Sequence, residues 1–194
     1  MNIALIGYGY WGPNIAKNIF TNHKLSLHSI CDLRQVRLDK AFNSYKNSTY
    51  YETDYQKLLS NQEIQAIAIA VETSSHYQIA KDALNKGKHI YIEKPFTSTV
   101  QEAKDLARLA ENKGLTIHVN HIMMYHPCIR KIKDLIDNNE LGEILYFEAM
   151  RMNLGQIKKD VSAMADLAIH DLSIIDYLSD GKEPFYIKAV GEKK

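Results

Sequence analysis

Cysteine, net charge and long apolar runs are all scarce in this sequence. Its two cysteines, Cys31 and Cys128, lie far apart and form no CxxC pair, which excludes a disulfide framework and favours a reducing compartment. The 24 basic and 23 acidic side chains leave a net charge of +1, which excludes the electrostatic footprint of a nucleic-acid-binding protein. The longest apolar run, around Ile64–Val71, is too short to cross a bilayer. We therefore expect a cytoplasmic protein with no nucleic-acid or membrane partner.

The sequence does contain a regular alternation of short apolar segments with longer amphipathic ones. The opening segment has the pattern of a strand rather than of a signal peptide. Segments typical of strands are 2–6, 25–31, 49–51, 64–71, 89–92 and 115–119. Segments typical of helices are 11–22, 34–45, a stretch that Ser74 or Ser75 caps and that ends at Lys86, and 97–113. This alternation predicts the α/β class, with a Rossmann-type doubly wound parallel sheet over residues 1–119.

The pattern changes after about Val119. We predict a helix over 127–138, an alternating strand over 143–152, a helix from about 163 to 178 and a last strand over 185–190. Residues 120–194 are therefore expected to form a smaller second domain with a sheet of two strands. Two strands alone are marginal in water, so this domain is expected to pair with a second copy, giving a homo-oligomer, or with the rest of such a domain.

A dinucleotide-binding signature follows the first predicted strand. Gly7, Gly9 and Gly12 form G-x-G-x-x-G, which allows a tight turn, close approach of a pyrophosphate and close helix–strand packing. Asp32 lies twenty residues after Gly12, where its carboxylate can accept hydrogen bonds from the adenosine ribose, and this favours NAD.

Other residues near the signature leave alternatives open. Arg34 and Arg37 either reach a 2′-phosphate, which keeps NADP possible, or belong to a solvated helix face. Tyr10 and Trp11 either line the cofactor pocket or, in the case of Trp11, pack the first helix on the sheet. His76 either borders the cofactor or packs at a helix start. The predicted cofactor-binding set is Gly7, Tyr8, Gly9, Tyr10, Trp11, Gly12, Asp32, Leu33, Arg34, Val71, His76, Glu93 and Lys94.

Three further residues carry the expected chemistry. Lys94 follows a predicted strand at the carboxyl edge of the sheet, where ligands bind in open α/β folds. It is either a surface lysine or a donor that stabilises a substrate alkoxide. Asp166 and His170 are four residues apart and share one helix face. They are either a surface pair or a carboxylate that orients a general base.

These segments resemble the Gfo/Idh/MocA oxidoreductase family, which includes glucose–fructose oxidoreductase and inositol dehydrogenase. The resemblance rests on residues 3–9, on the Gly-Lys-His…Glu-Lys-Pro run over 87–95 and on residues 166–171. It implies that NAD or NADP binds in the N-terminal domain and that a hydroxyl or keto group of a sugar reacts at the second domain. It also implies that Lys94, Asp166 and His170 are catalytic. Since family chains continue well past Val190 to complete the open sheet, the resemblance implies that residues 120–194 are an incomplete α+β substrate domain with an open sheet. The chain is therefore expected to be C-terminally short and weak or inactive alone.

Within the family, residues 8–14, 141–144 and 151–155 resemble the branch that acts on nucleotide-linked amino sugars. This resemblance makes Arg151 and Asn153 candidate substrate contacts, unless they merely end a strand. His121 is a candidate pocket-lining residue. It has a possible metal spacing with His118, but no Cys or third ligand stands near, so no metal is expected. The rival to a sugar oxidoreductase is a regulatory or assembly subunit that binds NAD without turnover.

The chain departs from the family pattern at three places. Residues 71–73 read Val-Glu-Thr where members usually carry Thr-Pro. Ala165 and Ile169 stand where members of the suggested branch usually have Trp and Pro. These differences lie in the loop expected to border the nicotinamide and beside the expected catalytic pair, so the pocket is expected to be altered.

Overall fold

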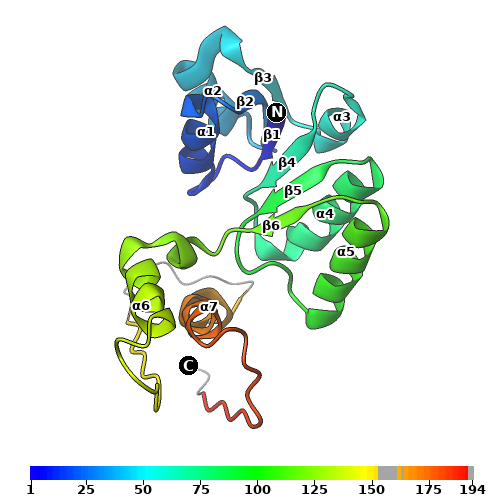
Figure 1. The fold of residues 1–194 in the computed structure, drawn as a ribbon. Coiled ribbons are helices and arrows are strands. Elements are labelled where there is room, and N and C mark those ends of the chain that lie inside the picture. Colours follow the sequence, from blue (N-terminus) through cyan, green and yellow to red (C-terminus); the bar gives the residue numbers. More distant parts are fainter. Residues whose placement is uncertain (153–160, 163, 192–194) are drawn as a thin grey trace. The chain divides into compact units, whose positions relative to one another are not determined.

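The protein is described by a computed structural model in which residues 1–152, 161–162 and 164–191 are placed (Figure 1). The chain divides into two compact units. The first comprises Met1–Asn120 and Gln156–Asp166, and the second comprises His121–Gly155 and Leu167–Lys194.

A six-stranded parallel sheet forms the centre of the first unit (Figure 1). Its spatial order is β3-β2-β1-β4-β5-β6, which is the Rossmann order and confirms the predicted α/β class. Between β1 and β4 the order of the strands reverses, and ligands of such sheets bind at the carboxyl ends of the strands at this point. The strands are β1 (Asn2–Ile6), β2 (Ser26–Cys31), β3 (Tyr50–Glu52), β4 (Ala66–Ile69), β5 (His89–Ile92) and β6 (Ile117–Val119).

Helices cover both faces of this sheet, because alternate side chains of a strand point to opposite faces. Ala4 and Ile6 of β1 belong to the core cluster with α4 and α5, whereas Ile3 and Leu5 belong to the cluster with α1 and α2. All of β4 is buried, as its continuous apolar run predicts. The helices of this unit are α1 (Gly12–Thr21), α2 (Gln35–Tyr45), α3 (Tyr55–Ser60), α4 (His76–Asn85) and α5 (Val100–Asn112).

The helix starts agree only in part with the sequence interpretation. The short helix α3 was not predicted, although Asp54 before it caps the helix by accepting a hydrogen bond from the backbone N–H of Gln56 at 3.0 Å. Ser75 does stand at the N-cap of α4, but its side chain makes no capping hydrogen bond within the described chain. A full capping box of Thr99 and Glu102 begins α5.

The second unit contains helices but no strand among its described residues. Helix α6 (Pro127–Asp137) confirms the prediction for 127–138. The predicted helix near 163–178 is present as a π-helical turn, Met164–Ala168, followed by α7 (Ile169–Leu178).

The predicted strands over 143–152 and 185–190 are both wrong, because neither segment is a strand in the structure. Their alternating side chains are largely exposed, as at Leu145, Met150, Phe185 and Ile187. Alternation encodes one apolar face, but a strand also needs a partner for its backbone N–H and C=O groups, and the described chain supplies none here.

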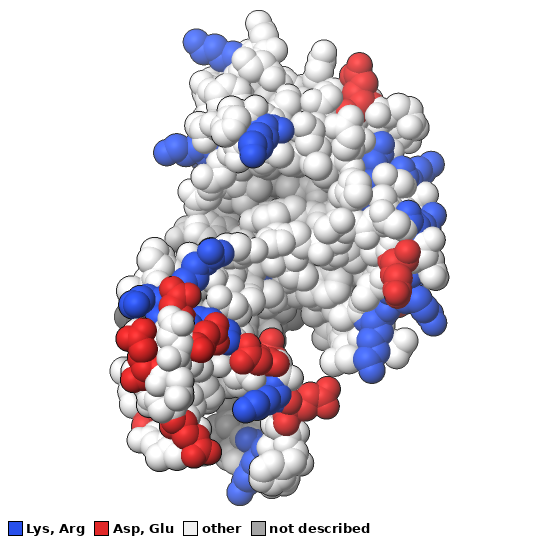
Figure 2. All heavy atoms as spheres, in the orientation of Figure 1, with Lys and Arg blue, Asp and Glu red and all other residues white. Residues whose placement is uncertain are grey.

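No helix in the placed ranges has the length and apolar character needed to span a bilayer. On the face shown in Figure 2, basic and acidic side chains are interspersed, and neither sign forms a continuous patch. This distribution agrees with the net charge of +1.

Candidate functional site

The glycine loop joins the carboxyl end of β1 to α1. Gly7 has a φ of +98°, and a Cβ added to it would lie 2.4 Å from the carbonyl oxygen of Ala70. A Cβ on Gly12 would lie 2.3 Å from the carbonyl oxygen of Gly7. Both positions therefore require glycine for the protein's own packing, at the point where the ends of β1 and β4 approach each other.

Gly9 has different surroundings. The three atoms nearest to a Cβ built there all belong to the guanidinium of Arg37, at 3.5–3.6 Å, so no backbone atom beyond the chain neighbours lies closer than these. The protein interior does not demand glycine at this position, so its backbone can be approached from outside. Helix α1 begins directly afterwards with no acidic residue in its first turn and no side-chain cap at Trp11. Its N-terminal N–H groups and dipole thus suit an anion, and the loop fits a pyrophosphate.

Asp32 follows β2 and is only 5% exposed. Its Oδ2 accepts hydrogen bonds from the backbone N–H of Tyr8 at 2.8 Å and from Nη1 of Arg37 at 3.1 Å. Its Oδ1 accepts from the backbone N–H of Arg34 at 2.9 Å. These bonds fix the carboxylate beside the glycine loop, where it fits the ribose of a dinucleotide. Leu33, which lies between Asp32 and Arg34 in the sequence, is exposed.

The aromatic residues of the loop take opposite positions. Tyr8 is buried and packs in the same core cluster as Tyr45. Burial, and to a smaller extent the neighbouring hydroxyl of Tyr8, raises the pKa of Tyr45 to about 12. Tyr10 is 91% exposed and stacks with Trp11, their ring centroids 6.1 Å apart. Since Trp11 belongs to neither core cluster, the structure gives no support to the alternative in which it packs α1 on the sheet.

Lys94, just beyond β5, forms an ion pair with Asp166. Its Nζ donates to the carboxylate of Asp166 at 2.8 Å and to the backbone carbonyl of the same residue at 2.7 Å. The two side chains are 13% and 19% exposed, so the pair is largely shielded from solvent. Helical spacing relates Asp166 to His170 but cannot indicate its contact with Lys94, which lies 72 residues away in the chain.

His76 is the first residue of α4 and is 1% exposed. Its Nδ1 is 3.0 Å from the carbonyl oxygen of Pro95, and its Nε2 is 3.2 Å from that of Val71. The imidazole thus joins the loop after β4 to the loop after β5. Glu93 is also buried, and its carboxylate accepts from the side-chain amide of Asn120 at 2.7 Å. The buried side chains of His76 and Glu93 thus hold the segments that flank Lys94. Their direct contact with a cofactor stays a prediction.

The remaining predicted residues belong to the second unit. His170 lies in the first turn of α7, and its carbonyl accepts from the hydroxyl of Ser173 at 2.8 Å. Arg151 makes two hydrogen bonds to the carboxylate of Asp171, at 2.7 and 2.8 Å, which hold the pKa of that carboxyl below its usual range. His121 stands at the N-cap of the 3₁₀ turn Ile122–Tyr125. Asn153 lies outside the described residues.

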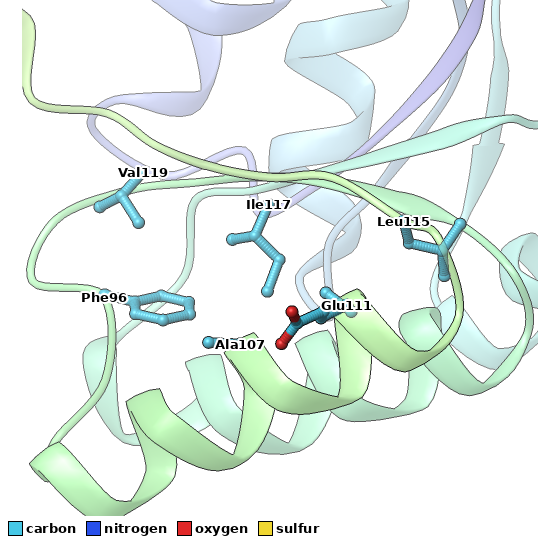
Figure 3. A pocket seen from close by; sticks show the side chains of 7 residues that line it. Phe96, Ala107, Glu111, Leu115, Ile117 and Val119 are labelled. Atoms are coloured by element: carbon cyan, nitrogen blue, oxygen red, sulfur yellow. The ribbon is translucent and has the colours of Figure 1, made fainter.

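A hollow of the first unit lies between α5 and the edge strand β6 (Figure 3). Its lining is apolar except for Glu111. Phe96 and Val119 stand together at one end of the hollow in this view, and Leu115 stands at the other. None of the predicted catalytic or cofactor-binding residues lines it.

The comparisons with known proteins agree with this geometry. The model of the GFO_IDH_MocA family, described as an oxidoreductase family with an NAD-binding Rossmann fold, matches residues 1–121. UDP-N-acetylglucosamine 3-dehydrogenase of Acidithiobacillus ferrooxidans is 35% identical over 130 residues, which are 66% of this chain and 40% of that protein. The scyllo-inositol 2-dehydrogenase (NAD(+)) of Bacillus subtilis is 27% identical over 181 residues, which are 90% of this chain and 53% of that protein.

The crystal structure of scyllo-inositol dehydrogenase from Lactobacillus casei with bound NAD(H) and scyllo-inositol has the same fold. It aligns with a TM-score of 0.77 at 20% identity, over 92% of this chain and 56% of that one. The chain therefore spans about half the length of the relatives it matches.

Proposed function

Because this chain belongs to the Gfo/Idh/MocA family of oxidoreductases with an NAD-binding Rossmann domain, we propose that it binds a nicotinamide dinucleotide and serves the oxidation or reduction of a sugar-like substrate. The observation that carries the proposal is the geometry of the first unit. The open side of Gly9, the uncapped start of α1 and the carboxylate of Asp32 are proposed to form one cofactor site, because Asp32 bonds the backbone N–H of Tyr8 next to Gly9. The ion pair of Lys94 and Asp166 lies in the same unit.

The substrate proposed is a hexose or inositol hydroxyl or the corresponding ketone, and a nucleotide-linked sugar in particular. The relative of higher identity is named for UDP-N-acetylglucosamine and another for scyllo-inositol. Both contain a six-membered ring with several hydroxyl groups, so a donor that holds one hydroxyl oxygen serves either. His121, Arg151 and Asn153 are proposed to contact the substrate, with Arg151 oriented by Asp171.

The proposed division of work rests on Lys94, Asp166 and His170. When bound, the cofactor supplies the hydride acceptor or donor at its nicotinamide ring. Asp166 takes two of the three ammonium N–H directions of Lys94, which leaves the third to bond the reacting oxygen. His170 takes the hydroxyl proton in oxidation and returns it in reduction. Asp166 therefore orients Lys94, a role that its spacing from His170 alone does not suggest.

The test is a rise in absorbance of the reduced nicotinamide band when the protein is mixed with NAD and UDP-N-acetylglucosamine, or with NAD and scyllo-inositol. Binding of NADH without turnover on any such substrate would favour the rival function, a regulatory or assembly subunit. Failure to bind either nicotinamide cofactor would contradict both.

We expect NADH to bind more tightly than NADPH. The buried carboxylate of Asp32 repels a 2′-phosphate, and its ion pair with Arg37 offsets this repulsion only in part. A net repulsion of roughly 1 kcal/mol corresponds to about fivefold in affinity. Dissociation constants measured from the fluorescence of the two reduced cofactors check this expectation. Tighter binding of NADPH would mean that an arginine, rather than Asp32, dominates the ribose site.

The exposed apolar residues of the second unit lead us to expect self-association. Phe185, Ile187 and Leu145 are each at least 76% exposed, and apolar surface of this kind favours burial against another chain. Light scattering should give a mass above that of one 22.2 kDa chain. Leu145→Glu with Phe185→Glu should shift the protein toward the monomer, whereas Tyr50→Glu, at an exposed position of the first unit, should not. A monomer at all concentrations would contradict a homo-oligomer formed through residues 120–194.

A further inference from the structure

Arg37 occupies an unexpected place in the cofactor site. It lies in the first turn of α2, and its Nη1 donates to Oδ2 of Asp32 at 3.1 Å. The same guanidinium is the nearest group to the open side of Gly9, 3.5–3.6 Å from a Cβ built there. Its cation therefore lies between the carboxylate that suits the adenosine ribose and the backbone that suits the pyrophosphate.

The ion pair changes how Asp32 can discriminate between NAD and NADP. Oδ2 already accepts from the backbone N–H of Tyr8 and from Arg37, and Oδ1 accepts from the backbone N–H of Arg34. Arg37 also offsets the negative charge that would repel a 2′-phosphate. Its side chain is 34% exposed, whereas that of Asp32 is 4% exposed. The guanidinium can therefore turn toward a ligand while the carboxylate stays in place.

We propose that Arg37 determines the cofactor range of this chain, because its guanidinium receives the 2′-phosphate of NADP and so admits NADP in spite of Asp32. This inference rests on the proposed function. A guanidinium has five N–H donors, and one of them satisfies Asp32. The others can form a charge-assisted pair with two phosphate oxygens, which is the geometry in which arginine binds phosphate best.

Arg34 provides a matched comparison. It is exposed, and within the described residues it contributes its backbone N–H, not its side chain, to Asp32. Removing the Arg34 side chain deletes the same charge from the same turn but leaves the Asp32 ion pair intact. A general loss of positive potential is thereby separated from the loss of a specific phosphate partner.

The experiment measures dissociation constants of NADH and NADPH for the unsubstituted chain, Arg37→Leu and Arg34→Leu. Competition by adenosine 2′,5′-bisphosphate and by AMP isolates the 2′-phosphate. We expect Arg37→Leu to weaken NADPH and the bisphosphate about ten- to a hundredfold. Its affinities for NADH and AMP should stay within about threefold, and Arg34→Leu should keep the original ratio of the two cofactors. Thermal unfolding of each variant verifies that it is folded.

Three results would overturn the inference. An equal loss of NADH and NADPH affinity in Arg37→Leu would place the guanidinium on the pyrophosphate instead. An unchanged NADPH affinity would remove Arg37 from cofactor binding, and a larger effect of Arg34→Leu would transfer the role to that residue. If the unsubstituted chain binds neither cofactor, the proposed function itself fails, which is a different outcome from NADH binding with an unaltered ratio.

Discussion

Lys94→Ala and His170→Ala should each lower the rate of the chemical step by about a hundred- to ten-thousand-fold while binding of NADH is retained. Lys94 is proposed to hold the reacting oxygen and His170 to carry its proton. Neither belongs to the part of the site, at Gly9 and α1, that fits the pyrophosphate. A single-turnover experiment with protein in excess over UDP-N-acetylglucosamine measures the chemical step, and cofactor fluorescence measures NADH binding.

Lys81→Ala is the matched control for Lys94→Ala. Lys81 on α4 also pairs with a carboxylate, that of Asp105 on α5, at 3.5 Å, but it lies outside the proposed site. Its replacement should leave the rate within about twofold, because an exposed ion pair contributes little to stability. An unchanged rate in Lys94→Ala or His170→Ala would remove that residue from the mechanism.

Asp166→Asn tests whether the carboxylate of Asp166 orients Lys94. The amide keeps one acceptor oxygen for the ammonium but removes the charge that holds it. A fall in the maximal rate with little change in NADH affinity would agree with a role in orienting Lys94.

The first unit could be predicted from the sequence because its signals are local. The apolar run at β4 is buried on both faces, and the glycine signature lies between β1 and α1 where the spacing places it. Helix α3 escaped prediction because six residues with only Leu58 and Leu59 buried are too few to show a helical period.

The second unit shows the limit of such signals. Residues 143–152 alternate as a strand does, but pairing depends on a partner that a local pattern does not encode. The site has the same limit. Helical spacing can relate Asp166 to His170, but the ion pair of Asp166 with Lys94 joins residues 72 positions apart, which no local spacing encodes. The pair of Arg37 and Asp32 depends likewise on how α2 turns back after β2.

Gly7→Ala should destabilise the folded protein by about 2–5 kcal/mol. A left-handed backbone costs a residue with a Cβ roughly 1–2 kcal/mol, and φ is +98° at this position. The new methyl group would also lie 2.4 Å from the carbonyl oxygen of Ala70 and 2.9 Å from the side chain of Val71, and overpacking of this kind costs about 1–3 kcal/mol more. Urea unfolding followed by circular dichroism measures the change in the free energy of unfolding.

Gly9→Ala separates the needs of the fold from those of the ligand. The atoms nearest to its methyl group would be those of the flexible guanidinium of Arg37, at 3.5–3.6 Å, so stability should change by less than about 1 kcal/mol. The same methyl group would stand on the face that a pyrophosphate must approach, so the affinity for NADH and NADPH should fall together, by about tenfold or more. If Gly9→Ala proved as destabilising as Gly7→Ala, the glycine at position 9 would be required for folding, and the proposal that the loop binds phosphate would be contradicted. Unaltered affinity in a stable Gly9→Ala protein would place the dinucleotide elsewhere.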